Sequence, residues 1–205
     1  RIHGTGLAGG RRYTSMEFVD GLSLGSLIPA EGMDPRRALE VARDVARALQ
    51  AAHSGGVIHR DVKPGNILIE RGGAGDPGGG RARLVDFGIA QLDDGGTRLT
   101  RSGDLLGTPV YLSPEQALGM PTDARSDVFS LGATLYHMLL GRPPRDEAPG
   151  PLAFQKVAHE EPTPIGKLRP EVSRDVATNC SKALRLDPRD RYRAAGAMAD
   201  DIDRF

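Results

Sequence analysis

The sequence contains no tryptophan, and its one cysteine, Cys180, rules out a disulfide within the chain. A fold that does without disulfides is typical of a reducing compartment. Cys180 is therefore expected to be a small buried hydrophobic side chain in a helix, because unpaired cysteines are more often buried than reactive.

An excess of charge of one sign is also lacking, since 27 Lys and Arg residues are balanced by 27 Asp and Glu residues. This zero net charge argues against a nucleic-acid or polyanion binder. No apolar run approaches the length of about 20 residues that spans a bilayer, so no membrane segment is expected within this stretch. The first residues, Arg1-Ile2-His3, lack an initiator Met and a signal-peptide pattern, and we interpret them as a cut end.

What the chain does have is a dense polar stretch at residues 59–66, His-Arg-Asp-Val-Lys-Pro-Gly-Asn, followed by an apolar run of strand type. A carboxylate, an ammonium and a carboxamide so close together suit the attack of a hydroxyl group on a phosphate. Asp61 can orient the hydroxyl and accept its proton, and Lys63 can neutralise charge on the moving phosphoryl group. Asn66 can hold a magnesium ion.

This stretch resembles the catalytic loop of protein kinases, H-R-D-x-x-x-x-N. Lys63 followed by Pro64 is similar to the serine/threonine subclass, because tyrosine kinases usually place Ala or Arg there. The resemblance implies an α+β, predominantly α fold: a kinase large lobe with a hinge and a remnant of the small-lobe sheet. Residues 1–19 would be that remnant with the hinge strand, and residues 20–205 the large lobe, so the domain would be truncated at its N-terminus.

A second motif, Asp86-Phe87-Gly88, lies 20 residues after Asn66 and directly after a predicted strand at 83–85. Alone the tripeptide is a weak signal, but at this spacing it resembles the metal motif of kinases. The resemblance implies that Asp86, together with Asn66, holds the magnesium that bridges the β- and γ-phosphates of ATP. The expected cofactors are therefore ATP and Mg²⁺.

Residues 107–115, Gly-Thr-Pro-Val-Tyr-Leu-Ser-Pro-Glu, are similar to the substrate-docking loop of kinases and its terminal A-P-E motif, with Ser113 in place of Ala. The resemblance implies that Thr108 bonds Asp61 and Lys63. The polar segment 89–108 resembles an activation loop. Its candidate phosphorylation sites, whose phosphate could pair with Arg60, are Thr97, Thr100 and Ser102.

Two further contacts are implied by the same family. Glu115 should pair with Arg191, which ties the docking loop to the lower helices. Asp127 should accept backbone N–H bonds near His59 and Arg60, which holds the catalytic loop.

Residues 13–19 predict a strand, followed by a turn at Asp20-Gly21. The strand lies about 40 residues before the catalytic loop, where it resembles the last small-lobe strand and hinge of a kinase. On that match Met16 lies beside the adenine pocket. The Glu17 carbonyl and the Val19 N–H bond the adenine edge. Leu68, from the strand after the catalytic loop, forms the floor under the ring.

Residues 4–9, Gly-Thr-Gly-Leu-Ala-Gly, match G-x-G-x-x-G formally. A kinase phosphate loop should be followed roughly 15 to 20 residues later by a strand lysine, yet Lys63 is the first lysine in the chain. No strand precedes the glycines, so a dinucleotide-binding motif is not indicated either. We interpret the segment as a flexible turn between two strands.

Helix signals are clearest where Asp34-Pro35 opens an apolar stripe that runs to about His53. His53 is taken as a helix-end residue with no chemical role. A long apolar helix is predicted at 123–141, stopped by Gly141, with His137 as a packed core histidine. The remaining predicted elements are a strand pair at 67–69 and 83–85 and helices at 152–159, 172–186 and 194–205.

The sequence thus predicts a serine/threonine protein kinase domain, a signalling transferase that moves the ATP γ-phosphoryl group to Ser or Thr hydroxyls of protein substrates. Its expected location is cytoplasmic, with a membrane anchor outside this stretch left open. Two alternatives remain: a pseudokinase that scaffolds partners, and a fragment that is inert by itself but cut from an active parent. The pseudokinase alternative is disfavoured because Asp61, Lys63, Asn66 and Asp86 are all retained.

Overall fold

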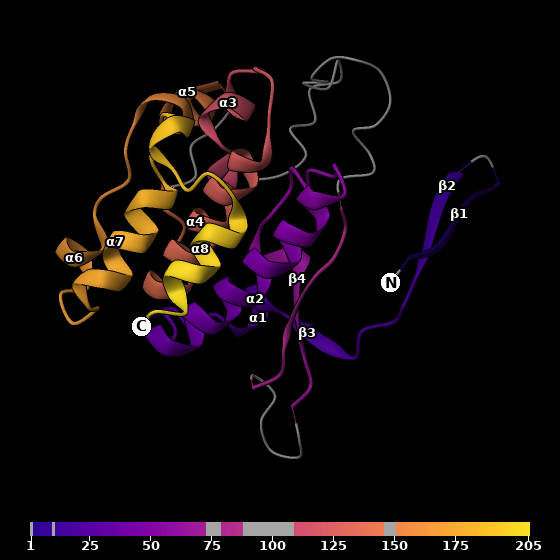
Figure 1. Ribbon diagram of the computed structural model, residues 1–205, viewed down its shortest axis with the longest axis horizontal. Helices are drawn as coiled ribbons and strands as arrows, with labels where there is room; N and C mark the ends of the chain where they lie inside the picture. Colours follow the sequence, from indigo (N-terminus) through magenta and orange to yellow (C-terminus); the bar gives the residue numbers. More distant parts are fainter. Residues whose placement is uncertain (1, 10, 73–78, 88–108, 146–150) are drawn as a thin grey trace.

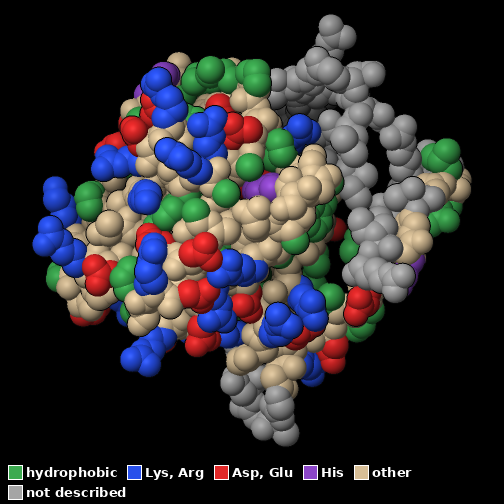
Figure 2. All heavy atoms as spheres, viewed as in Figure 1, with side chains coloured by type: hydrophobic (Ala, Val, Ile, Leu, Met, Phe, Trp, Pro, Cys, Tyr) green, Lys and Arg blue, Asp and Glu red, His purple; other side chains and the backbone are tan. Residues whose placement is uncertain are grey.

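Residues 2–9, 11–72, 79–87, 109–145 and 151–205 are described by the computed structural model (Figure 1). Helices dominate this part of the chain, and its strands form one two-stranded and one three-stranded sheet. The predicted α+β, predominantly α class is therefore confirmed. On the face shown in Figure 2, acidic and basic side chains are intermixed over the helices, in keeping with the zero net charge.

The N-terminal strands β1 (Ile2–Ala8) and β2 (Arg11–Met16) form an antiparallel hairpin that stands apart from the helices (Figure 1). The expectation of a turn over residues 4–9 was wrong, because Gly4 and Gly6 lie inside β1; among the described residues of the hairpin the chain turns at Gly9, with φ of 56°. A Cβ at Gly6 would lie 2.7 Å from the ring of Tyr13, its cross-strand partner, and this exposed ring would have to shift.

The predicted hinge strand is also shorter than expected. β2 ends at Met16. This residue pairs with Ile2, which is the first residue of β1. Residues 17–19 lie outside both strands of the hairpin and form an irregular connection to the next sheet.

The second sheet has the order β3-β4-β5, from Gly21–Ser23, Ile67–Glu70 and Ala82–Leu84, and all pairs are antiparallel. The predicted pairing of β4 with β5 is confirmed. Strand β3 was not predicted, since Gly21 was assigned to a turn. Position 21 is occupied by glycine because a Cβ at this position would collide with the carbonyl oxygen of Ile69 in β4.

After the short helix α1 (Leu24–Leu27), the long helix α2 (Pro35–Ser54) begins where predicted. The Asp34 side chain caps it by accepting the N–H of Arg37 at 3.0 Å. The apolar stripe faces the core as expected, with the buried residues Ala38, Leu39, Val41, Ala42, Val45, Ala46 and Leu49.

Helix α4 (Ala124–Leu140) is the centre of the helical part and is buried along most of its length. It ends at Gly141, whose φ of 68° is the left-handed conformation that a helix C-terminus favours. A Cβ at Gly141 would collide with the carbonyl oxygen of Ala30, so the C-terminal end of α4 is packed directly against the loop before α2.

The other helices surround α4: α7 (Arg174–Ala183) packs on it and α8 (Ala195–Ile202) packs on α2, while α5 (Pro151–His159) lies beside α3 (Pro114–Ala117). The short helices α3 and α6 (Ile165–Leu168) were not predicted. Cys180 is fully buried in α7, as predicted, and burial raises the pKa of its thiol. Among the described helices, none combines the length and apolar character needed to span a bilayer.

Candidate active site

The loop between α2 and β4 brings Asp61, Lys63 and Asn66 into direct contact. Asp61 Oδ2 accepts hydrogen bonds from Lys63 Nζ and from Asn66 Nδ2, each at 2.8 Å. Asn66 Nδ2 also donates to the Asp61 carbonyl oxygen at 2.8 Å. Both N–H groups of this amide are therefore used, while its Oδ1 has no donor among the described residues and can serve as an acceptor or metal ligand. The Asp61 and Lys63 side chains are 43% and 38% exposed, so a substrate can reach them.

Asp127, in the first turn of α4, holds this loop in place. It is fully buried, and its carboxylate accepts the backbone N–H of His59 at 2.8 Å and of Arg60 at 2.7 Å. The predicted role of Asp127 is confirmed. His53 lies in the last turn of α2, as predicted. Its Nε2 lies 2.7 Å from Asp127 Oδ2, a contact that was not predicted.

The segment that carries Asp86 lies against the same loop. The Val85 N–H donates to the Asn66 carbonyl oxygen at 2.9 Å, and His59 Nε2 lies 3.0 Å from the Val85 carbonyl oxygen. The His59 and Phe87 ring centroids are 4.6 Å apart. Asp86 is thus held beside Asn66 by contacts on both sides of it.

A metal at this place would draw on Asn66 Oδ1 and the exposed Asp86 carboxylate, an all-oxygen set of the kind that suits magnesium. Magnesium is usually bound through one or two carboxylates, with waters and substrate phosphates as the other ligands. In the part of the chain that the structure describes, no three His, Cys, Asp or Glu side chains gather into a metal site. The metal roles of Asn66 and Asp86 stay a prediction.

Two residues of the site, Arg60 and Asp86, have left-handed backbone conformations, with φ of 66° and 57°. For a residue with a side chain such a conformation costs roughly 1–2 kcal/mol. At Arg60 the hydrogen bond from its N–H to buried Asp127 offsets this cost. Sequence reasoning gave no signal for the strain.

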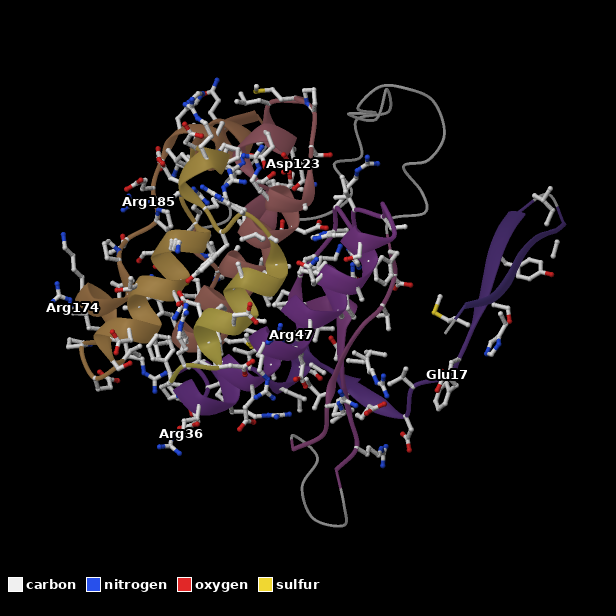
Figure 3. All side chains as sticks on the ribbon, in the orientation of Figure 1. Glu17, Arg36, Arg47, Asp123, Arg174 and Arg185 are labelled. Atoms are coloured by element: carbon white, nitrogen blue, oxygen red, sulfur yellow. The ribbon has the colours of Figure 1, made fainter. Side chains whose placement is uncertain are left out.

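The residues predicted to touch adenine come from two places. Met16 ends β2, and Glu17 and Val19 lie in the connection to β3, where Figure 3 shows Glu17 between the hairpin and the rest of the chain. Leu68 is half-buried in β4. Their contacts with adenine stay a prediction. Thr108 and the three candidate phosphorylation sites lie outside the described residues.

Glu115 and Arg191 form the predicted buried ion pair. Arg191 Nη1 and Nη2 donate to the two Glu115 oxygens at 2.8 and 2.9 Å, and Ser126 Oγ donates to Oε1 at 2.7 Å. Burial alone would raise the pKa of Glu115, but the hydrogen bonds from Arg191 and Ser126 outweigh it. The pKa therefore lies below its usual value of 4.5.

A contact that was not predicted joins the docking segment to the catalytic loop. Gln116 Nε2 donates to the Arg60 carbonyl oxygen at 2.7 Å, while its Oε1 accepts from Ser113, the N-cap of α3. The spacing of Ser113 and Gln116 is a capping-box signal that could have located this helix start.

Replacing Asp127 by Asn should loosen the catalytic loop. His59 and Arg60 donate to different oxygens of Asp127, and in Asn one of these oxygens is replaced by an NH₂ group that would face a donor. A hydrogen bond to a charged group is worth about 1.5–3 kcal/mol, and we expect a loss of unfolding free energy of that order. Hydrogen exchange should become faster at the amides of residues 59 and 60. Asp200→Asn on the surface is the control; equal exchange in both variants would contradict the role of Asp127.

A helical domain in which a buried aspartate holds a loop carrying an aspartate, a lysine and an asparagine, beside the Asp86-Phe87 pair, has the architecture of a phosphoryl-transferring kinase. Comparison with known proteins agrees. Residues 3–201 match the protein kinase domain, and the chain belongs to the protein kinase family.

The chain is similar to bacterial serine/threonine-protein kinases. It is 42% identical to PknB of Mycobacterium tuberculosis over 200 residues, which are 96% of this chain and 31% of that protein. It is 41% identical to PknB of Mycobacterium leprae over 199 residues, again 96% and 31% of the two chains. The chain thus spans about a third of the length of these curated relatives.

Two solved structures have the same fold. The PknI kinase domain of Mycobacterium tuberculosis, a double mutant, aligns with a TM-score of 0.75 and 27% identity over 99% of this chain and 70% of that chain. Rad53 residues 1–466, solved in complex with AMP-PNP, aligns with a TM-score of 0.76 and 26% identity over 97% of this chain and 48% of that one.

Proposed function

We infer that the whole protein is a serine/threonine protein kinase that transfers the γ-phosphoryl group of ATP to Ser or Thr hydroxyls of protein substrates. The observation that carries this proposal is the contact of Asp61 with both Lys63 and Asn66 in an accessible loop. Residues 1–19 are assigned to the small lobe and hinge, and residues 20–205 to the large lobe. The use of ATP supports a cytoplasmic location for the domain.

In this mechanism Asp61 orients the substrate hydroxyl and accepts its proton as the oxygen attacks the γ-phosphorus. Lys63, which contacts the same carboxylate, neutralises charge on the transferring group. Asn66 and Asp86 would hold a magnesium ion, which supplies charge neutralisation at the β- and γ-phosphates. Thr108 would bond Asp61 and Lys63. Little covalent chemistry is asked of the protein, because positioning and electrostatics account for most of the catalysis.

The nucleotide would lie between the connection after β2 and the second sheet. Met16 would border the adenine pocket, the backbone of Glu17 and Val19 would bond the adenine edge, and Leu68 would lie under the ring. The pseudokinase alternative is disfavoured, because each of the four chemical side chains of the catalytic and metal motifs is retained.

Residues 1–205 by themselves should bind Mg-ATP weakly and transfer no phosphate at a useful rate. They contain no lysine before Lys63, so the strand lysine that reaches the α- and β-phosphates is lacking. Such charge-assisted contacts are worth about 1.5–3 kcal/mol. The purified chain is titrated with Mg-ATP and assayed on a generic Ser/Thr substrate, with Asp86→Asn as the control that should weaken any specific residual binding. Micromolar affinity with measurable turnover would refute this expectation.

A further inference from the structure

A polar cavity, with a volume of about 180 Å³, lies away from the catalytic loop. Its walls come from the end of α4, the segment that follows it, α5 and the residues after α5. The residues that carry charge or a buried ring in this lining are Tyr136, Arg142, Arg145, Lys156, Glu160 and Glu161. None of these takes part in the chemistry assigned to Asp61, Lys63 and Asn66.

Arg145 is the unusual member of this lining. Only 8% of it is exposed, and burial lowers the pKa of its guanidinium. Its Nη2 donates to the carbonyl oxygen of Glu160. Its Nε and Nη1 are buried and have no hydrogen-bond partner among the described residues. Three of its five N–H donors are thus without an acceptor there.

The aromatic ring beneath Arg145 compensates its charge only in part. The guanidinium carbon lies 5.8 Å from the ring centroid of Phe129, near the outer limit of a cation–π contact. The same ring also meets Arg191, at 4.8 Å. A ring face accepts no hydrogen bond of ordinary strength, so the free donors of Arg145 still require an acceptor.

The charges around the cavity decide what kind of acceptor fits. Arg142 and Lys156 add to the positive charge of Arg145. Of the two acidic residues in the described lining, Glu161 is already paired with Arg185, at 3.3 Å, which leaves Glu160 as the opposing charge among these residues. Water could satisfy the N–H donors but could not neutralise a buried cation, whereas an oxyanion does both.

We propose that this cavity is a binding site for a phosphate group, free or as a phosphate monoester, with Arg145 as the anchoring residue. The guanidinium presents its donors in a planar fork that matches phosphate oxygens, and Lys156 contributes a point charge from α5. The proposal does not use the catalytic residues, so it stands or falls independently of the proposed function.

Isothermal titration of the chain with sodium phosphate, against sodium chloride at equal ionic strength, tests the proposal. We expect saturable binding of one phosphate per chain, at least tenfold weaker in Arg145→Gln and unchanged in Arg174→Gln. Arg174 is an exposed arginine on α7 and serves as the matched control (Figure 3). No saturable binding to the unsubstituted chain, or equal affinity in Arg145→Gln, would overturn the proposal.

Two additions keep the test decisive. If Arg145→Gln does not fold, as judged by circular dichroism, Lys156→Gln on the surface of α5 replaces it. This variant should bind phosphate several-fold more weakly, and unchanged affinity would be evidence against the site. O-phosphoserine and acetate are titrated in parallel. Phosphoserine that binds as tightly as phosphate identifies a monoester as the ligand, and phosphate alone identifies the free anion. Acetate that binds as tightly as phosphate would refute the phosphate assignment.

Discussion

Asp61→Asn should lower the phosphotransfer activity of the whole protein by about a hundred- to ten-thousand-fold, the usual contribution of a general base. The variant keeps the size of the side chain and an oxygen that Lys63 or Asn66 can still donate to, so the loop should keep its shape. What it loses is the carboxylate that accepts the proton of the substrate hydroxyl. Turnover of a generic Ser/Thr peptide with ATP is the measurement.

Asp200→Asn is the control for this experiment, because Asp200 is exposed and its partner is Arg47, far from the catalytic loop. Its activity should match that of the unsubstituted protein. The thermal unfolding of both variants is recorded alongside the kinetics, so that a loss of activity is not confused with a loss of fold. An Asp61→Asn protein with near-normal turnover would remove Asp61 from the mechanism.

Arg191→Met should produce the largest loss of stability, about 3–5 kcal/mol of unfolding free energy, because it leaves the buried carboxylate of Glu115 without its cation. The substitution also withdraws the donors from three backbone carbonyl oxygens, those of Arg125, Arg185 and Leu186. Urea unfolding followed by circular dichroism measures the change.

The chain offers a matched control two residues away. Arg189 also pairs with a carboxylate, that of Asp187, but its side chain is 84% exposed, so Arg189→Met should leave the unfolding free energy nearly unchanged. Adding Glu115→Gln to Arg191→Met should recover part of the loss, since no charge is then stranded. Equal losses for Arg191→Met and Arg189→Met would show that the buried pair does not stabilise the fold.

The same pair predicts a dependence on pH. The pKa of Glu115 is lower in the folded protein than its usual value of 4.5. Its ionisation therefore contributes stability that is fully present above about pH 4.5 and is lost as the pH falls through the folded-state pKa. In Arg191→Met this acid-sensitive part of the stability should disappear.

Motif spacing and helix periodicity accounted for much of the fold. As predicted, Asp34 caps the start of α2 and Gly141 caps the end of α4. Helix ends of this kind can be predicted because a cap depends on the residue type at the helix end itself. The Glu115–Arg191 and Asp127 contacts span long sequence separations, and only the resemblance to a family made them predictable.

Contacts outside any motif were missed for a physical reason. Gly21 looked like a turn residue, and only its packing against Ile69 of β4, far along the chain, makes it part of a strand. The contacts of His53 with Asp127 and of Gln116 with Arg60 join residues 74 and 56 positions apart. The unpaired donors of Arg145 result from the packing of three separate segments around this side chain. No local sequence pattern predicts such packing.

The left-handed conformations of Arg60 and Asp86 have a consequence for how such a domain can be improved. Glycine adopts this conformation without steric cost, so a library screened only for thermal stability should accumulate glycine at these two positions. Each exchange would remove a side chain from the edge of the catalytic loop, and the one at position 86 would remove the carboxylate of the metal motif. A directed-evolution experiment on this chain therefore needs to keep both positions fixed, since the substitutions that raise stability there would remove side chains of the catalytic and metal motifs.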